Sequence, residues 1–291
     1  MPDSFDNQQR TAPAVIAGKA AAAVAAEGKL SAAAPDPRAA AFFDIDNTVV
    51  RGASLFHLAR GLAARKFFTA GDVATFAWKQ AKYRLAGSED MDDMASAADA
   101  ALAFVAGHRV EEVTDLGDEI FDERIQGKLY AGTIALAQDH LEQGQRVWLV
   151  SAAPVEIASI IAAKLGLTGA LGTVSEVIGG VYTGRLVGTP LHGPAKAEAV
   201  RALAEREGLD LARCAAYSDS SNDIPMLTLV GHPVAVNPDA RLRRHARALG
   251  WRVHDYRTGR KAAKIGIPTA MVMGATAGIA AGVLTSRRKS H

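Results

Sequence analysis

The sequence predicts an α/β protein built on a doubly wound parallel sheet, and three observations support this class. Short apolar runs of strand length occur at 39–43, 146–150, 213–218 and 232–236. Segments with helical spacing of apolar residues alternate with them, at 133–143, 154–165, 195–207 and 240–249. Polar residues follow the apolar runs. Because alternating strands and helices form Rossmann-like parallel sheets with a crevice at the carboxyl ends of the strands, we expect these polar residues to share one crevice.

An all-helical cap is expected to interrupt this pattern over residues 52–132. Apolar residues recur at three- and four-residue spacing in "SLFHLARGLAARKFF", "GDVATFAWKQAKYRLA", "MASAADAALAFVAG" and "VEEVTDLGDEIFDERI", which is typical of amphipathic helices. Because the insertion follows the first strand, it would lie over the crevice as a lid. The stretch "GGVYTGRL" at 179–186 indicates a tight β-hairpin near the same rim.

The first 37 residues differ from the middle of the chain. They are rich in alanine, with scattered glycine and proline and almost no large side chains, so little apolar surface is present to offset the entropy of ordering. We therefore expect a disordered tail over 1–37. The alternative is an isolated helix around 13–27, since alanine has the highest helix propensity. A signal peptide is not expected, because acidic residues precede the first basic one and no compact apolar core follows.

The C-terminal region predicts a membrane anchor. A basic linker at 257–264 precedes residues 265–286, which carry no charged side chain and are long enough, as a helix, to cross a bilayer. A basic tail follows at 287–291. The alternative is a buried or surface helix of the globular domain. Gly274, Gly278 and Gly282 share one helical face, a spacing that would let two such helices pack closely in a homodimer.

Composition limits the partners and the compartment. The net charge is only +2 over 291 residues, which gives no reason to expect a nucleic-acid partner. Cys214 is the single cysteine, so an intramolecular disulfide is excluded. We expect a cytoplasmic catalytic domain held at the cell membrane by a single-pass helix, and the alternative is a cytoplasmic protein without an anchor.

Two aspartates end the first predicted strand. In "DIDNT" at 44–48, Asp44 can attack phosphorus to give an aspartyl phosphate. Asp46 can protonate the leaving oxygen and later accept a proton from the hydrolytic water. Because two carboxylates repel a phosphate group, a hard cation is needed, and Mg²⁺ prefers oxygen ligands. The pair therefore indicates Mg²⁺-dependent phosphoryl transfer.

Four segments together resemble a known family. They are "DIDNT" at 44–48, Ser151 after the strand "VWLV", Lys196 in "HGPAKAE", and "SDSSNDIPML" at 218–227. In this order they resemble the four motifs of phosphatases of the haloacid dehalogenase (HAD) superfamily. The helical insertion directly after the first motif resembles subclass IB, which contains phosphoserine phosphatase. The resemblance spans about 39–253 and implies a catalytic core made of 38–51 and 133–256.

The resemblance also implies a role for each matching residue. Asp44 would be the nucleophile and Asp46 the general acid and base. Mg²⁺ would be held by the Asp44 side chain and the Asp46 main-chain carbonyl, together with Asp219 and a supporting or completing Asp223. The phosphate oxygens would be bound by Thr48, Ser151, the amide of Ala152, and Lys196. Alanines in "SAAP" stand where family members often carry glycines.

The substrate is less well indicated than the reaction. Phosphoserine phosphatases carry a glutamate shortly after the first motif that meets the ammonium group of the substrate, whereas residues 49–60 contain no carboxylate here. Arg51, His57 and Arg60 stand in this stretch and are the candidates for specificity. If they face the crevice, they favour an anionic or hydroxylated substrate. The alternative is a solvated or capping role, which is common for these residue types.

Three functions are compatible with these observations. The first is a Mg²⁺-dependent phosphomonoester hydrolase for a small phosphorylated metabolite such as phosphoserine. The second is a membrane-anchored lipid-phosphate phosphatase, acting on phosphatidylglycerol phosphate or lysophosphatidate. The third is a non-catalytic, membrane-anchored binding protein, which the intact motifs make the least favoured.

Overall fold

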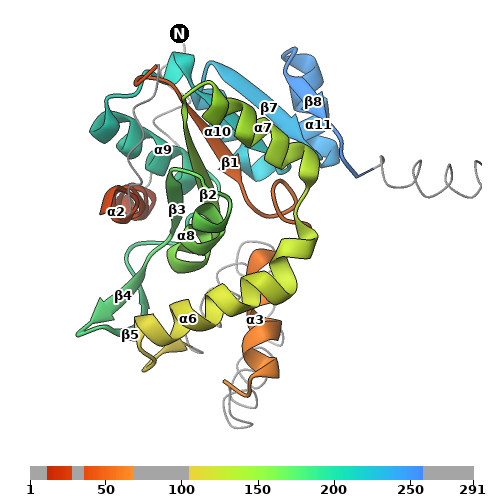
Figure 1. The fold of residues 1–291 in the computed structure, drawn as a ribbon. Helices are drawn as coiled ribbons and strands as arrows, with labels where there is room; N and C mark the ends of the chain where they lie inside the picture. The colour runs from red at the N-terminus through yellow and green to blue at the C-terminus, as the bar shows by residue number, and fades with distance from the viewer. Residues whose placement is uncertain (1–11, 28–35, 68–104, 258–291) are drawn as a thin grey trace, which may run out of the picture. The chain divides into compact units, whose positions relative to one another are not determined.

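The computed structural model describes residues 12–27, 36–67 and 105–257, and the chain divides into two compact units, 1–254 and 255–291. The elements below belong to the first unit. Its centre is a six-stranded sheet with the order β3-β2-β1-β6-β7-β8, in which all neighbouring strands are parallel (Figure 1). The strands are β1 (Ala40–Asp44), β2 (Arg146–Pro154), β3 (Gly169–Thr173), β6 (Ala215–Ser218), β7 (His232–Val236) and β8 (Arg252–His254).

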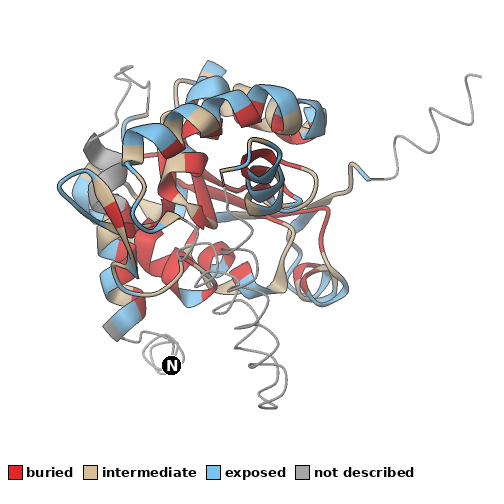
Figure 2. Ribbon diagram, turned by 90° about the horizontal axis from the view of Figure 1, so that it is seen from below, coloured by how far each residue is buried: buried red, intermediate tan, exposed pale blue. Residues whose placement is uncertain are grey.

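The central strand β1 shows why the sequence forms this sheet. All five of its residues are buried, because β1 lies between β2 and β6 and is covered on both faces, as is usual for parallel strands. Phe42 pairs with Trp148 on one side and with Ala216 on the other, and all three are fully buried. Figure 2 shows this buried layer running along the strands. The predicted α/β class with a parallel sheet is therefore confirmed.

The strands differ from the prediction in extent and number. Runs at 39–43, 146–150, 213–218 and 232–236 correspond to β1, β2, β6 and β7, but β2 continues to Pro154 after a register shift. The strands β3 and β8 are not predicted, because β3 reads "GALGT" and β8 has only three residues. Helices follow most strands, as expected, and they are α7 (Ala131–Glu142), α8 (Val155–Lys164), α9 (Pro194–Glu207), α10 (Ile224–Leu229) and α11 (Ala240–Ala248).

The predicted hairpin is confirmed. Strands β4 (Ser175–Ile178) and β5 (Val181–Leu186) pair antiparallel. Gly179 and Gly180 connect them with φ of 61° and 79°, and two consecutive positive φ values are what a tight two-residue hairpin turn requires. The amide of Val110 donates to the Gly180 carbonyl over 3.0 Å, so the turn contacts the start of a cap helix.

The cap is helical where the structure describes it. It contains α3 (Ser54–Ala64) and α6 (Val110–Ile120), and α6 continues into a π-helical turn at Phe121–Ile125 and a 3₁₀ turn at Gln126–Lys128. The guanidinium of Arg65 pairs with Glu119 and Glu123 at 3.0 and 2.7 Å, which ties α3 to α6. The helices predicted within 68–104 lie outside the described residues.

Two linker segments connect the cap to the core, and they lie side by side. The amide of Arg51 donates to the Lys128 carbonyl, and the amide of Tyr130 donates to the Val49 carbonyl, each over 2.9 Å. The guanidinium of Arg51 also lies over the Tyr130 ring, 5.2 Å from its centroid. The entry into the cap and the exit from it are thus held together a few residues after Asp44 and Asp46 in the chain.

The expectation of a disordered tail over 1–37 is wrong for residues 12–27. These form helix α2 (Ala12–Glu27), close to the range of the alternative prediction, but the helix is not isolated, because it packs along α9 (Figure 1). Ala14, Ala17 and Ala21 are buried in this interface. A Cβ atom at Gly18 would lie 2.6 Å from the backbone nitrogen of Ala199, so the helices approach backbone to backbone. Small side chains allow this contact, and they are the same residues that made the segment look too poor in apolar surface to order.

The C-terminal predictions are not tested by the structure. The linker at 257–264 beyond its first residue, the apolar segment 265–286 with Gly274, Gly278 and Gly282, and the basic tail 287–291 lie outside the described residues. Within the described ranges, no helix combines the length and the hydropathy needed to cross a bilayer.

Candidate active site

A buried lysine joins two of the predicted carboxylates. Asp44 is the last residue of β1 and is 4% exposed. Lys196 lies in the first turn of α9, and its Nζ donates to Asp44 Oδ1 over 2.5 Å and to Asp223 Oδ2 over 2.8 Å. Lys196 and Asp223 are buried as well. Residues that are far apart in the sequence therefore meet at the carboxyl end of the central strand.

Carboxylates outnumber cations around Asp44. Burial raises the pKa of Asp44 well above its usual value although Lys196 lowers it, and Asp223, Asp219 and Asp46 raise it further. Burial, together with Asp223, raises the pKa of Asp219 to about 7. Burial alone would lower the pKa of Lys196, but the two carboxylates that it contacts raise it above the usual lysine value. Lys196 is therefore a fixed positive charge in a site with excess negative charge.

The loop after β6 is anchored on both sides. Ser218, the last residue of β6, donates from Oγ to Asp223 Oδ2 over 2.7 Å. The amide of Asp239 donates to the Asp219 carbonyl over 2.8 Å, and Asp239 Oδ2 accepts from the amide of Ser221 over 2.7 Å. The segment from Ser218 to Asp223 is thus held from within and by Asp239, which lies after β7 at the start of α11. Asp223 shares Lys196 with Asp44 at the end of β1, and Asp219 is close enough for its charge to raise the pKa of Asp44.

The loop after β1 turns sharply around Asp46. Asn47 has φ of 57°, a conformation that asparagine adopts more readily than most residues. Its side chain Oδ1 accepts from the Gly52 amide over 3.0 Å, and its carbonyl accepts from Asn237 Nδ2 over 2.9 Å. Asp46 Oδ1 accepts from the amide of Ser54 over 2.8 Å. The first turn of cap helix α3 therefore orients the carboxylate predicted to be the general acid.

Two hydroxyl groups predicted to bind phosphate are buried near this loop. Thr48 is fully buried, and its Oγ1 has no hydrogen-bond partner among the described residues. Ser151 follows Val150, which pairs with Asp44 across the β1–β2 register. Its Oγ accepts from the Ala153 amide over 3.0 Å, and this leaves the hydroxyl hydrogen for another acceptor.

The end of β2 is held by the side chain of Thr173. Thr173 Oγ1 donates to the Ala152 carbonyl over 2.7 Å and accepts from the Leu191 amide over 2.9 Å. Ala152 itself remains half-buried. Thr173 thus links the ends of β2 and β3 to the loop before α9, which carries Lys196.

The three specificity candidates have contacts within the cap and its linkers. Arg51 lies over the Tyr130 ring as described above, and His57 Nε2 donates to the Arg51 carbonyl over 3.0 Å. Arg60 is exposed, and its guanidinium lies 5.8 Å from the centroid of the Phe56 ring. The structure gives none of them a contact with Asp44 or Asp46, and their role in specificity stays a prediction.

The donor set fits a hard cation. Among the described residues, no three His, Cys, Asp or Glu side chains are arranged as a metal-binding cluster. The raised pKa values of Asp44 and Asp219 arise from burial and from neighbouring carboxylates. A divalent cation would relieve this repulsion, and oxygen ligands are those that Mg²⁺ prefers.

Several supporting residues escape sequence reasoning. Ser54 contributes a main-chain amide, which any residue type can supply. Asn237 and Asp239 follow the apolar run of β7, and a polar pair after a strand of the predicted sheet is the signal that would have placed them at the same edge. Ser218 lies inside the quoted motif, but its sequence position does not reveal that it holds Asp223.

Comparisons with known proteins agree with this geometry. The haloacid dehalogenase-like hydrolase family matches residues 41–228. Phosphoserine phosphatase SerB1 of Mycobacterium tuberculosis is 56% identical over 270 residues, which cover 93% of this chain and 87% of that protein. Histidinol-phosphatase of Neisseria meningitidis serogroup C is 30% identical over 225 residues, which cover 75% of this chain and 98% of that protein.

A solved structure shares most of the fold. The crystal structure of a protein of unknown function from Bordetella pertussis Tohama I superposes with a TM-score of 0.66 at 30% identity, covering 75% of this chain and 99% of that chain. The family match, the 56% identity to a phosphatase, and the meeting of Asp44, Lys196 and Asp223 point the same way. The chain belongs to the haloacid dehalogenase-like hydrolases and is one of their phosphatases.

Proposed function

We propose that this phosphatase hydrolyses phosphomonoesters of small metabolites through an aspartyl phosphate on Asp44. The observation that carries the proposal is the buried Lys196 between Asp44 and Asp223, with Nζ–O distances of 2.5 and 2.8 Å. This lysine holds the nucleophilic carboxylate in place and offers fixed positive charge to a phosphoryl group that approaches it.

Each side chain has a defined part in the proposed reaction. An Asp44 oxygen attacks phosphorus, and the bond from phosphorus to the leaving oxygen breaks. Asp46, oriented by the Ser54 amide, gives its proton to that oxygen and then accepts a proton from the water that hydrolyses the acyl phosphate. The hydroxyls of Thr48 and Ser151, the Ala152 amide, and Lys196 bind the phosphoryl oxygens.

Mg²⁺ is the proposed cofactor. The Asp44 side chain, the Asp46 carbonyl, and Asp219 would hold it, and Asp223 would support the site. When bound, the cation offsets the repulsion between the carboxylates and the phosphoryl oxygens. Asp239 contributes by fixing the main chain of Asp219 and Ser221.

Phosphoserine is the proposed example of the substrate class. The proposal is supported by the 56% identity to a protein named phosphoserine phosphatase. The absence of a carboxylate in residues 49–60 is the departure that keeps the substrate open to test, and a relative at 30% identity is named histidinol-phosphatase. Membrane attachment through 265–286, with the lipid-phosphate activity that it would serve, stays a prediction from the sequence.

A substrate panel tests the proposal. Phosphate release is measured from phosphoserine, histidinol phosphate, lysophosphatidate and phosphatidylglycerol phosphate in vesicles, with Mg²⁺ present. The proteins compared are the full chain, the chain ending at residue 256, and the matched variant Asp44→Asn. We expect phosphoserine to have the highest kcat/KM with both chain lengths, and Asp44→Asn to release no phosphate.

Two results would contradict the proposal. A higher kcat/KM for histidinol phosphate would refute phosphoserine as the example while leaving the reaction intact. Activity confined to the vesicle-borne lipids, and lost in the shortened chain, would refute a small-metabolite substrate and establish the lipid-phosphate alternative.

A further inference from the structure

Helix α11 carries a row of exposed arginines beside β8, the last strand of the sheet (Figure 1). Arg241, Arg244 and Arg247 are exposed, whereas Leu242 and Ala246 are buried. Because consecutive residues of an α-helix are rotated by about 100° around its axis, the three arginines lie within an arc of roughly 120°, opposite the two buried side chains. The helix therefore has one face on the core and an arginine face, made of these three residues, in solvent.

The arginine face has no acidic partner. Within the described ranges, none of the three side chains forms an ion pair or a hydrogen bond. Residues 224–254 contain five arginines and a single acidic residue, Asp239. The carboxylate of Asp239 already accepts from the amides of Ser221 and Leu242, over 2.7 Å each. Since the net charge of the whole chain is only +2, the arginine face is a local concentration of uncompensated positive charge.

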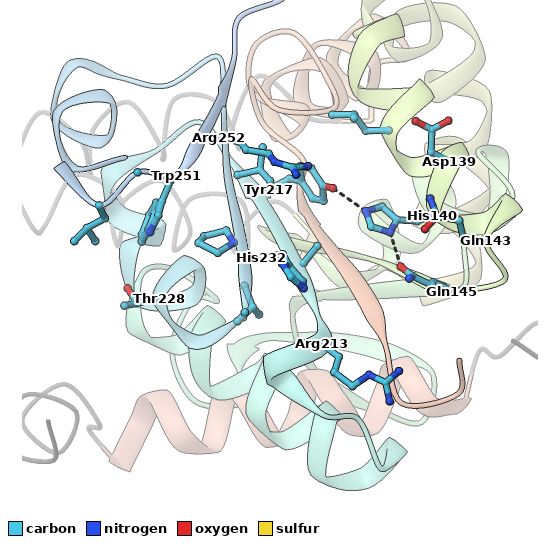
Figure 3. Close-up of a pocket in the computed structure, with 18 residues that line it drawn as sticks. Asp139, His140, Gln143, Gln145, Arg213, Tyr217, Thr228, His232, Trp251 and Arg252 are labelled. Carbon is cyan, nitrogen blue, oxygen red and sulfur yellow. Dashed lines mark hydrogen bonds between the residues drawn. The ribbon is translucent and has the colours of Figure 1, made fainter. Parts of the chain in front are cut away.

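Other cations of this region lie on the opposite side of the sheet. Arg213 and Arg252 line a hollow whose lining also includes Val234 (Figure 3). The next residue of β7, Ala235, belongs instead to the core cluster that contains Leu242 of α11. Successive side chains of a strand point to opposite faces of a sheet, so α11 and the hollow lie on opposite faces. The arginine face is thus a separate surface.

Two features next to the arginine face favour a membrane over a nucleic acid as its partner. Leu249 ends α11 and is 55% exposed, and exposed apolar side chains close to basic ones are typical of helices that lie in a membrane interface. Further along the chain come the basic linker 257–264 and the uncharged segment 265–286, for which the sequence predicts a membrane anchor. The nearly balanced net charge gives no corresponding reason to expect a nucleic acid.

We propose that the arginine face of α11 docks this protein on an anionic lipid bilayer. The guanidinium groups would contact lipid phosphates, while Leu242 and Ala246 keep the helix on the core. The proposal goes beyond the proposed function, because it does not depend on which phosphomonoester is hydrolysed. Helix α11 follows Asp239, whose amide donates to the Asp219 carbonyl over 2.8 Å. The docked helix would therefore begin next to the loop that carries Asp219.

Cosedimentation with vesicles tests the proposal on the full chain. One set of vesicles contains phosphatidylcholine alone, and in the other set about one third of the lipid is phosphatidylglycerol. We expect phosphatidylglycerol to raise the bound fraction, and a rise in salt from about 0.05 M to about 0.5 M to remove this increase, because salt screens exposed charges. Insertion of 265–286 would instead give binding to both sets of vesicles that resists salt.

Charge variants identify the surface. The triple variant Arg241→Gln, Arg244→Gln and Arg247→Gln should lower the phosphatidylglycerol-dependent partition by about a hundredfold, since each basic residue near an anionic bilayer contributes about fivefold. The matched control removes the same charge from three exposed positions on other elements, Lys66→Gln, Lys128→Gln and Arg206→Gln. The control should bind as the unmodified chain does. Thermal melting verifies that both variants are folded.

Four results would each overturn the proposal. Equal losses for the two triple variants would show that only the net charge matters. Unchanged binding by the α11 variant would place the attraction outside the arginine face. Equal binding of the unmodified chain to both sets of vesicles at low salt would show that anionic lipid has no part. Displacement of the vesicles by a short DNA duplex at the same phosphate concentration would assign the arginine face to a nucleic acid.

Discussion

Replacing Lys196 with methionine removes the cation that separates Asp44 from Asp223 while keeping the length of the side chain. Lys196 has a side chain that is 5% exposed, and the two carboxylates are 6% and 2% exposed. Removing one partner of a buried ion pair typically costs about 3–5 kcal/mol, because the remaining charges are left without compensation. We expect Lys196→Met to lose this much free energy of unfolding at neutral pH, and to lose phosphatase activity.

The surface of the same protein supplies a matched control. Lys164 also bridges two aspartates, Asp118 and Asp122, with Nζ–O distances of 2.9 Å each, but its carboxylate partners are more than half exposed. Exposed ion pairs contribute little because water screens them. Lys164→Met should therefore be far less destabilising than Lys196→Met, although the chemical change is identical.

The pH dependence separates electrostatics from packing. Lys196 is the group that lowers the pKa of Asp44 against the effect of burial, so in the Lys196→Met protein this pKa rises further above its unfolded value. The resulting loss of stability begins above the unfolded pKa and grows as the pH rises toward the folded-state pKa. The stability gap to the unmodified protein should therefore narrow as the pH falls from about 8 to about 5. Urea unfolding followed by circular dichroism measures the gap. Equal losses for the two lysine variants, or a gap that does not change with pH, would refute this reasoning.

Three further changes have distinct expected results. Asp46→Asn should slow turnover by at least about a hundredfold, since a general acid and base contributes this much. Its Mg²⁺ affinity, measured by calorimetry, should stay close to that of the unmodified chain. A loss of affinity would contradict the main-chain carbonyl of Asp46 as the ligand. Gly18→Val should lower the free energy of unfolding by about 1–3 kcal/mol through overpacking against α9. Lys19→Val, at the exposed neighbouring position, should leave the free energy of unfolding nearly unchanged. Equal urea midpoints for the two variants would refute the α2–α9 contact. Burial lowers the pKa of His140 below that of an unfolded histidine. The stability that the neutral ring contributes is therefore lost as the pH falls below about 6.5. The free energy of unfolding of the His140→Gln protein should depend less steeply on pH, and an unchanged slope would contradict this expectation.

The sequence predicts the parts of the fold that have strong patterns. Continuous apolar runs reveal β1, β2, β6 and β7, because strands covered on both faces need them. The strand β3 is hidden by its glycines, one of which, Gly169, leaves room for the Trp148 ring: a Cβ atom there would lie 2.6 Å from it. Helix α2 is hidden for a related reason, since its contact depends on close backbone approach rather than on large side chains.

The residues of the candidate site also fall into those that the sequence predicts and those that it does not. Asp44, Lys196 and Asp223 are predictable because their chemistry requires particular side chains at strand and helix ends. The amide of Ser54 and the carbonyl of Asp219 are not, because main-chain groups leave no trace in residue type. Arg51 and His57 illustrate a second limit: their positions suggested specificity, and the structure shows their contacts with the linkers to the cap.

The central claim is that Asp44 carries the phosphoryl group during turnover. Acid quenching of the Mg²⁺-loaded enzyme during phosphoserine hydrolysis, followed by borohydride reduction and peptide mass spectrometry, tests it most directly, because borohydride reduces an aspartyl phosphate to homoserine. The account predicts homoserine at position 44 in the unmodified chain and none in the Asp44→Asn chain. Phosphorylation or reduction at a different residue, or turnover by the Asp44→Asn protein at the unmodified rate, would contradict it.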